Sequence, residues 1–140
     1  MRSFLVCLLL AVALVSSGCA ITHDSKAAVG IKEAGTINII QNPSVRAGFL
    51  EAMKEWLTSN GYKYNVLPQN ADKSQGWVLT YIGQWSWDLT IYLAKASIKA
   101  YKDGVEVGNS EYSSTQGGLN LNKFSKADET IKKMMTDLFK

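Results

Sequence analysis

The chain has 140 residues, of which 46% are apolar and 19% charged, and its formal net charge is +3. This length and apolar content are typical of one globular domain and exclude a multidomain assembly. The 11 Gly, two Pro and two Cys exclude collagen-like, disordered and disulfide-scaffold proteins, and the small net charge excludes a nucleic-acid-binding surface.

Residues 1–18 have the layout of an export signal. Arg2 is followed by an unbroken apolar run over residues 4–15 and then by the small residues 16–18. A helix needs about 20 apolar residues to cross a bilayer, so this run is too short for a transmembrane segment and favours a signal peptide.

Cys19 directly follows the small residues, and Val15-Ser16-Ser17-Gly18-Cys19 resembles the lipobox of bacterial lipoproteins. The resemblance implies that Cys19 becomes the mature N-terminus and carries the palmitate and other acyl chains that hold the protein to a membrane. Ordinary signal cleavage, which would leave Cys19 as a lone exported thiol, is the alternative. In the Gram-negative lipoproteins that this segment resembles, a residue other than Asp directly after the lipidated cysteine directs the protein to the outer membrane. Ala20 occupies that position, so the resemblance implies transport to the outer membrane, and we expect the domain to face the periplasm.

Residues 19–35 are expected to be the lipidated cysteine and a flexible tether, because residues 20–35 contain few large apolar side chains. The only histidine, His23, lies in this segment. A single imidazole on a mobile tether has nothing to orient it as a metal ligand or base, so we expect it to be solvated.

The folded domain is expected to span residues 36–140. A β-branched strand over 36–40 ends at Asn42-Pro43, a helix follows from Val45 to a stop at Asn60-Gly61, and a second strand alternates up to Pro68. Two long strands, 77–84 and 87–101, come next. Asp103-Gly104 then makes a hairpin turn into a strand over 105–112.

A final helix is expected after Ser125, which would cap it, and its apolar stripe is Ile131, Met134, Met135 and Leu138. The predicted fold class is α+β, a two-layer sandwich in the order β-α-β-β-β-β-α. Both helices would pack on one face of a four- to five-stranded mixed or antiparallel sheet.

Trp85 and Trp87 are the first candidate binding residues, because two indoles two residues apart on a strand point from the same face and can stack on a sugar or an acyl chain. The alternative is that both pack in the core. Asp88 beside them is expected to be structural, since no second carboxylate stands at a spacing that suits acid–base work.

Residues 116–125 run glycine-rich toward the last helix, where free amides and Lys123 could hold an anion, although a plain glycine turn explains the same residues. Lys126, Lys133 and Lys140 share one helix face, as either a solvated face or an anionic-lipid patch. With no other cysteine or histidine in the mature chain, nucleophilic triads and zinc spacings are absent. We therefore expect no enzyme, cofactor or metal site.

The chain also resembles a family of small proteobacterial outer-membrane lipoproteins over nearly all its length. The matching pieces are the lipobox cysteine Cys19, Asn42-Pro43, Val66-Leu67-Pro68, Trp85-x-Trp87-Asp88-Leu89, Tyr101-x-Asp103-Gly104 and Gly117-Gly118-x-Asn120-Leu121-x-Lys123-Phe124.

The resemblance implies an exported, lipid-anchored domain and no particular activity. Some relatives carry cysteines at the positions of Asn38 and near Gln75, so their expected disulfide is absent here. We expect a non-enzymatic binding or structural module of the cell envelope with a protein partner. The alternative is a carrier of an envelope glycan or lipopolysaccharide through Trp85 and Trp87.

Overall fold

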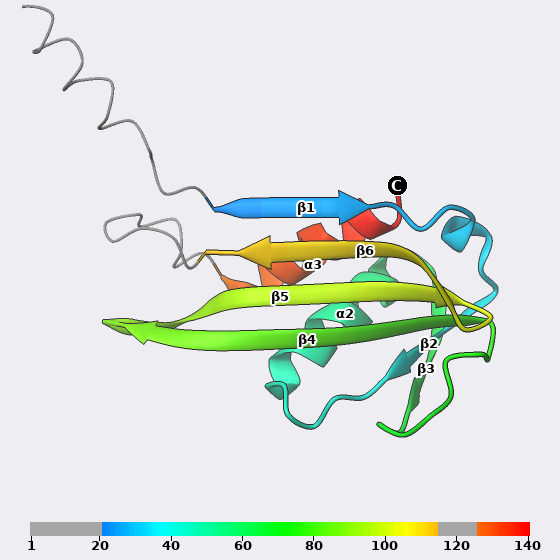
Figure 1. Ribbon diagram of the computed structural model, residues 1–140, viewed down its shortest axis with the longest axis horizontal. Helices are drawn as coiled ribbons and strands as arrows, with labels where there is room; N and C mark the ends of the chain where they lie inside the picture. The colour runs from blue at the N-terminus through cyan, green and yellow to red at the C-terminus, as the bar shows by residue number, and fades with distance from the viewer. Residues whose placement is uncertain (1–20, 115–125) are drawn as a thin grey trace, which may run out of the picture.

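The computed structural model describes residues 21–114 and 126–140, and these residues form a six-stranded sheet and two α-helices (Figure 1). The elements in chain order are β1 (Thr22–Lys26), the short 3-10 helix η1 (Ile31–Glu33), β2 (Thr36–Ile40), α2 (Ala47–Ser59), β3 (Lys63–Leu67), β4 (Trp77–Asp88), β5 (Thr90–Lys102), β6 (Val105–Ser113) and α3 (Ala127–Leu138).

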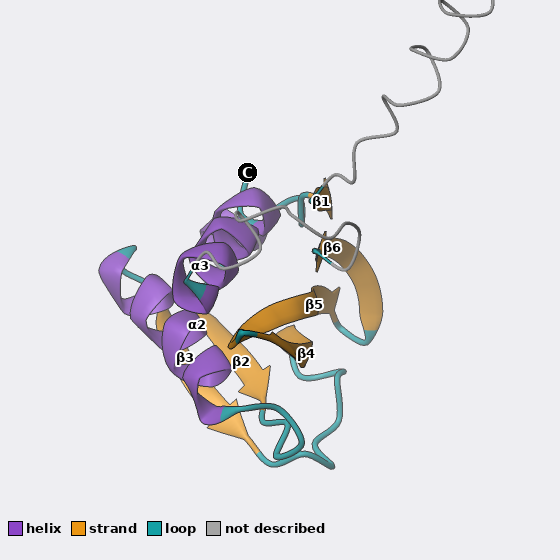
Figure 2. Ribbon diagram, turned by 90° about the vertical axis from the view of Figure 1, so that its left-hand side faces the viewer, coloured by secondary structure: helices purple, strands orange, loops and turns teal. Residues whose placement is uncertain are grey.

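The strands lie in the order β1-β6-β5-β4-β2-β3. β2 is parallel to β3 and β4, whereas the other neighbours are antiparallel, so the sheet is mixed. Both α-helices lie on the same side of the sheet (Figure 2). The predicted α+β class is confirmed, with six strands in place of four or five.

The loop from β2 into α2 is held by Asn42, which explains why the helix begins at Ala47 and not at Val45. The Asn42 backbone N–H donates to the Tyr81 hydroxyl at 3.1 Å, and the Asn42 side-chain amide donates to the Tyr81 carbonyl at 3.2 Å. Its Oδ1 accepts from the Ser44 N–H at 3.1 Å. These bonds commit residues 42–44 to an extended turn before the helix starts.

The hairpin between β4 and β5 turns later in the chain than predicted. We expected the chain to turn between residues 84 and 87, but Asp88 pairs with Thr90 and the turn is made by Leu89. Leu89 has φ 62°, a left-handed conformation that is rare for a bulky side chain. The sequence offers no Gly, Asn or Pro at 87–91, and Asp88 alone is a weak signal for a turn at this tip.

The prediction of a flexible tether up to residue 35 is wrong from Thr22 onward. β1 pairs antiparallel with β6 along its whole length, and the Ala28 N–H donates to the Leu138 carbonyl at 2.8 Å. Ile31 is only 1% exposed. Every β1 side chain is exposed, so backbone pairing forms this strand without any apolar pattern in the sequence.

The core lies between the sheet and the two helices. The predicted stripe of the last helix is confirmed, because all four of its apolar side chains are buried, and those of α2 join them from Phe49 to Leu57. The predicted cap, Ser125, lies outside the described residues.

A side-chain hydrogen bond joins β2 to the loop before β4. The Asn38 side-chain amide on β2 donates to the Gln75 carbonyl at 2.9 Å, which ties the loop before β4 to the sheet.

Candidate functional site

Trp85 is partly buried and packs against the edge of the hydrophobic core. Its ring meets the Phe49 ring edge-on, with centroids 6.3 Å apart and planes at 79°, and Phe49 stacks on Tyr81 at 5.0 Å. The Arg46 guanidinium lies 5.6 Å from the Trp85 ring centre, a cation–π distance. For Trp85 the packing interpretation holds.

The close approach of this indole depends on Gly83, two residues earlier on the same face of β4. A Cβ atom built on Gly83 would lie 2.8 Å from the Trp85 ring and 2.9 Å from the Phe49 ring. Contacts under 3.0 Å are steric overlaps, so only glycine admits the Trp85 ring here.

Trp87 has a different environment, although it shares a strand face with Trp85 as predicted. Its side chain is 71% exposed, because β4 and β5 extend past the two helices at this end of the molecule (Figure 1). Its neighbours at the hairpin tip, Leu89 and Ile91, are 87% and 51% exposed. We call Trp87, Leu89 and Ile91 the apolar tip.

The sequence reasoning missed Leu89 and Ile91. A signal was present, because residues 85, 87, 89 and 91 are all large and apolar at every second position. That alternation continues through the turn, so it marks one face of a whole hairpin.

The remaining predicted residues do not complete a common site. Asp88 ends β4 and is half-buried, and Lys123 with the glycine-rich segment lies outside the described residues, as does Cys19. The structure therefore brings together Trp85 and Trp87 on one strand face but describes no cleft walled by both indoles.

The surface of the described residues has several hollows, of which one borders a candidate residue and another lies on the open face of the sheet. One of about 550 Å³ lies beside Trp85, lined by Arg46, Gly48, Phe49, Lys126, Ala127, Asp128 and Ile131. Another, of about 700 Å³, lies on the sheet face away from the helices and is lined mainly by β1, β5 and β6, with Lys95, Lys99 and Glu111 among its polar side chains. Neither includes Trp87.

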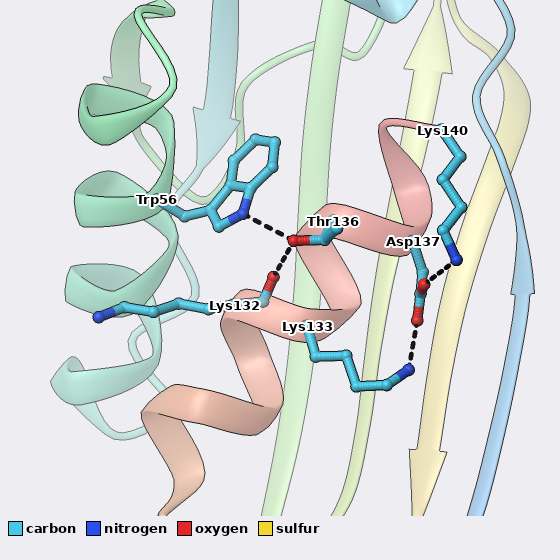
Figure 3. A network of polar contacts seen from close by, with 6 residues as sticks. All are labelled: Trp56, Lys132, Lys133, Thr136, Asp137 and Lys140. Atoms are coloured by element: carbon cyan, nitrogen blue, oxygen red, sulfur yellow. Dashed lines mark hydrogen bonds and ion pairs between the residues drawn. The ribbon is translucent and has the colours of Figure 1, made fainter.

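Two of the three lysines that were predicted to share a helix face, Lys133 and Lys140, pair with one carboxylate. Asp137 accepts from Lys133 at 2.7 Å and from Lys140 at 2.5 Å (Figure 3). These hydrogen bonds, that from Lys133 foremost, lower the pKa of the Asp137 carboxyl. On the same helix Thr136 accepts from the Trp56 indole at 3.0 Å, which joins α2 to α3 (Figure 3).

His23 lies on β1 and not on a mobile tether. Its ring centre is 4.9 Å from that of Tyr112, and partial burial, followed by the nearby Lys133, lowers its pKa. Across residues 21–114 and 126–140, no group of three or more His, Cys, Asp or Glu side chains is placed to hold a metal ion. Over the same residues, no helix is long and apolar enough to span a bilayer.

The chain has little similarity to known proteins. No protein-family model matches the chain, and no curated protein matches it. Among solved structures, the chain is similar to the crystal structure of a minor lipoprotein from Acinetobacter baumannii, at 9% sequence identity and a TM-score of 0.37. That alignment covers 75% of this chain and 81% of the other.

Proposed function

We propose that this protein is a lipid-anchored outer-membrane lipoprotein whose domain faces the periplasm. The observation that carries the proposal is Cys19, which directly follows an apolar run and three small residues and is the only cysteine after the signal. Ala20 in place of Asp supports the outer membrane as the destination. The described domain begins with β1 only three residues after Cys19, which suits a domain held close to its membrane.

The molecular role that we propose is a non-enzymatic binding or structural module of the cell envelope with a protein partner. Two carboxylates of the described domain, Glu106 and Asp137, are engaged in ion pairs with lysines. The pKa shifts of Glu106 and Asp137 are downward, caused first by hydrogen bonds from lysines. A general acid needs a raised carboxyl pKa, so neither Glu106 nor Asp137 has the property of a proton donor.

Metabolic labelling with palmitate tests the anchor. The wild-type protein is expected to incorporate the label and to fractionate with the outer membrane, and Cys19→Ser is expected to lose both. A Cys7→Ser variant is the matched control, because Cys7 leaves with the signal and its loss should change neither result. Equal labelling of wild type and Cys19→Ser would refute acylation at this residue.

Crosslinking in intact envelopes tests the partner. A photoreactive residue on the sheet face away from the helices, at Lys95, is expected to capture a reproducible protein neighbour, because this face is hollow and carries both charge signs. A probe at the exposed Val29 is the control. Failure to capture a defined protein from any position on that face would count against a protein partner.

A second candidate role is binding of an envelope glycan or lipopolysaccharide, favoured by the hollow beside Trp85. Arg46 and Lys126 line this hollow and suit the acidic groups of such ligands. Titration with envelope glycans while tryptophan fluorescence is followed should give a saturable change that Arg46→Gln weakens. A flat titration would exclude this role.

A further inference from the structure

The apolar tip lies at the same end of the molecule as the start of β1. In Figure 1 the hairpin of β4 and β5 and the beginning of β1 point the same way, and in Figure 2 both ends face the viewer. The strand register shows how far the hairpin tip and the start of β1 extend along the strand direction. Thr22 is paired to Ser113, Ser113 to Lys95, and Lys95 to Gln84, so these four residues lie in one row across the sheet.

The distances on the two sides of this row are similar. β4 continues four residues past Gln84 to Asp88, about 13 Å at ~3.3 Å per residue. Cys19 precedes Thr22 by three residues, a reach of about 10 Å when fully extended. A membrane that holds acyl chains on Cys19 therefore lies within reach of the apolar tip.

We propose that the apolar tip, Trp87, Leu89 and Ile91, inserts into the phospholipid surface to which Cys19 is anchored and sets the orientation of the domain on that surface. This proposal rests on the proposed anchor at Cys19. The chemistry of the tip fits a lipid surface, because tryptophan favours the membrane interface and leucine and isoleucine favour the acyl region beneath it.

The size and conformation of the tip favour lipid over a protein partner. Three side chains at the end of a two-stranded hairpin offer far less than the roughly 800 Å² per partner that a stable protein interface buries. Leu89 is also held at φ 62° with its side chain 87% exposed. A left-handed bulky residue is costly and gains nothing from packing in water, whereas insertion would bury its side chain.

The positive charge near the apolar tip also favours a phospholipid surface. The hollow beside Trp85 is lined by Arg46 and Lys126 against one carboxylate, Asp128, which leaves one excess positive charge. Anionic phospholipid headgroups attract such a charge at the level just behind the inserted side chains.

The test uses the lipidated protein, purified from membranes and reconstituted in phospholipid vesicles. Leu89→Cys and, as the control at the opposite end of the sheet, Val105→Cys each receive an environment-sensitive fluorophore; both positions are exposed. The label at 89 is expected to shift to the blue and to be quenched by brominated lipids, while the label at 105 should stay as in water. In a third variant, Leu89→Cys with Trp87→Ser and Ile91→Ser, the quenching is expected to fall about tenfold.

The outcomes separate failure of the tip from failure of the anchor. Labels at 89 and 105 that behave alike, or a probe at 89 that crosslinks to a protein and not to lipid in native envelopes, would overturn the tip proposal. Maleimide labelling of the chain without an added thiol would instead show that Cys19 is free. That result refutes the anchor, and vesicle co-sedimentation of the unlipidated chain then tests the tip separately.

Discussion

Asp137 is the charged residue among the buried polar residues of the described domain. Its side chain is largely covered, yet it accepts hydrogen bonds from two exposed lysines one turn away on either side. A covered carboxylate is tolerated only when its charge is compensated. Two of the three evenly spaced lysines, Lys133 and Lys140, are exposed as the solvated interpretation expects, and they also neutralise this carboxylate.

Asp137→Asn is expected to lower the free energy of unfolding by about 1 kcal/mol at pH 7. The folded-state pKa of Asp137 lies below the ordinary value of 3.8, so its contribution is complete above that value and is lost as the pH falls through the folded pKa. The difference between wild type and variant, measured by urea denaturation from pH 7 to pH 2.5, should therefore shrink below about pH 3.8. Asp103→Asn, on an exposed turn, is the control and should change stability by less than about 0.5 kcal/mol.

The hairpin of β4 and β5 is packed against a helix along part of its length and exposed at its tip. At its inner end Trp85 packs on Phe49 of α2, and at its outer end Trp87 lies free of the helices. The same strand face is therefore core at one residue and surface two residues later. The position at which α2 begins decides where that change occurs.

Gly83→Ala tests the packing of this element. The added Cβ overlaps the Trp85 and Phe49 rings, so we expect a loss of about 1–3 kcal/mol in the free energy of unfolding and a shifted tryptophan emission. Gly48→Ala in α2 is the control, because nothing lies within 4 Å of its new Cβ. It should leave stability unchanged or raise it by about 0.5 kcal/mol. Equal stability of both variants would contradict the close contact at Gly83.

At the scale of the whole molecule, the first and last described segments are packed together. Ala28 is hydrogen-bonded to the end of α3, and it also lies against Gly108 of β6, where a Cβ would come within 2.7 Å of the Ala28 nitrogen. The segment from β1 to Ala28 is therefore part of the domain. Because β1 is held against the sheet in this way, an anchor three residues before it would be able to orient the hairpin tip.

Ile31→Ala tests whether this segment stabilises the fold. Removing a fully buried isoleucine is expected to cost about 2–5 kcal/mol, whereas Val29→Ala, at a side chain 89% exposed, should cost less than about 0.5 kcal/mol. Thermal or urea unfolding measures both. Two variants equal in stability to wild type would mean that residues 22–31 behave in solution as a detached tether.

The sequence by itself determined the class of fold and most of its elements. Period-two and helical patterns located β2, α2, β3 and α3, and Asp103-Gly104, with φ 50° and 87°, marked the turn into β6. These features are local, because they depend on which side chains face a core and which turns a backbone can make.

Tertiary structure alone decided the rest. The sequence of β1 has no alternating apolar residues, because none of its side chains is buried. The strand forms through backbone pairing with residues nearly ninety positions away. The turn at Leu89 contains no Gly, Asn or Pro. The different exposure of Trp85 and Trp87 depends on the reach of a helix from another part of the chain. The alternation of large apolar residues over 85–91 is present in the sequence, but coverage by distant segments decides which of them are exposed, which is why only the assembled sheet located the apolar tip.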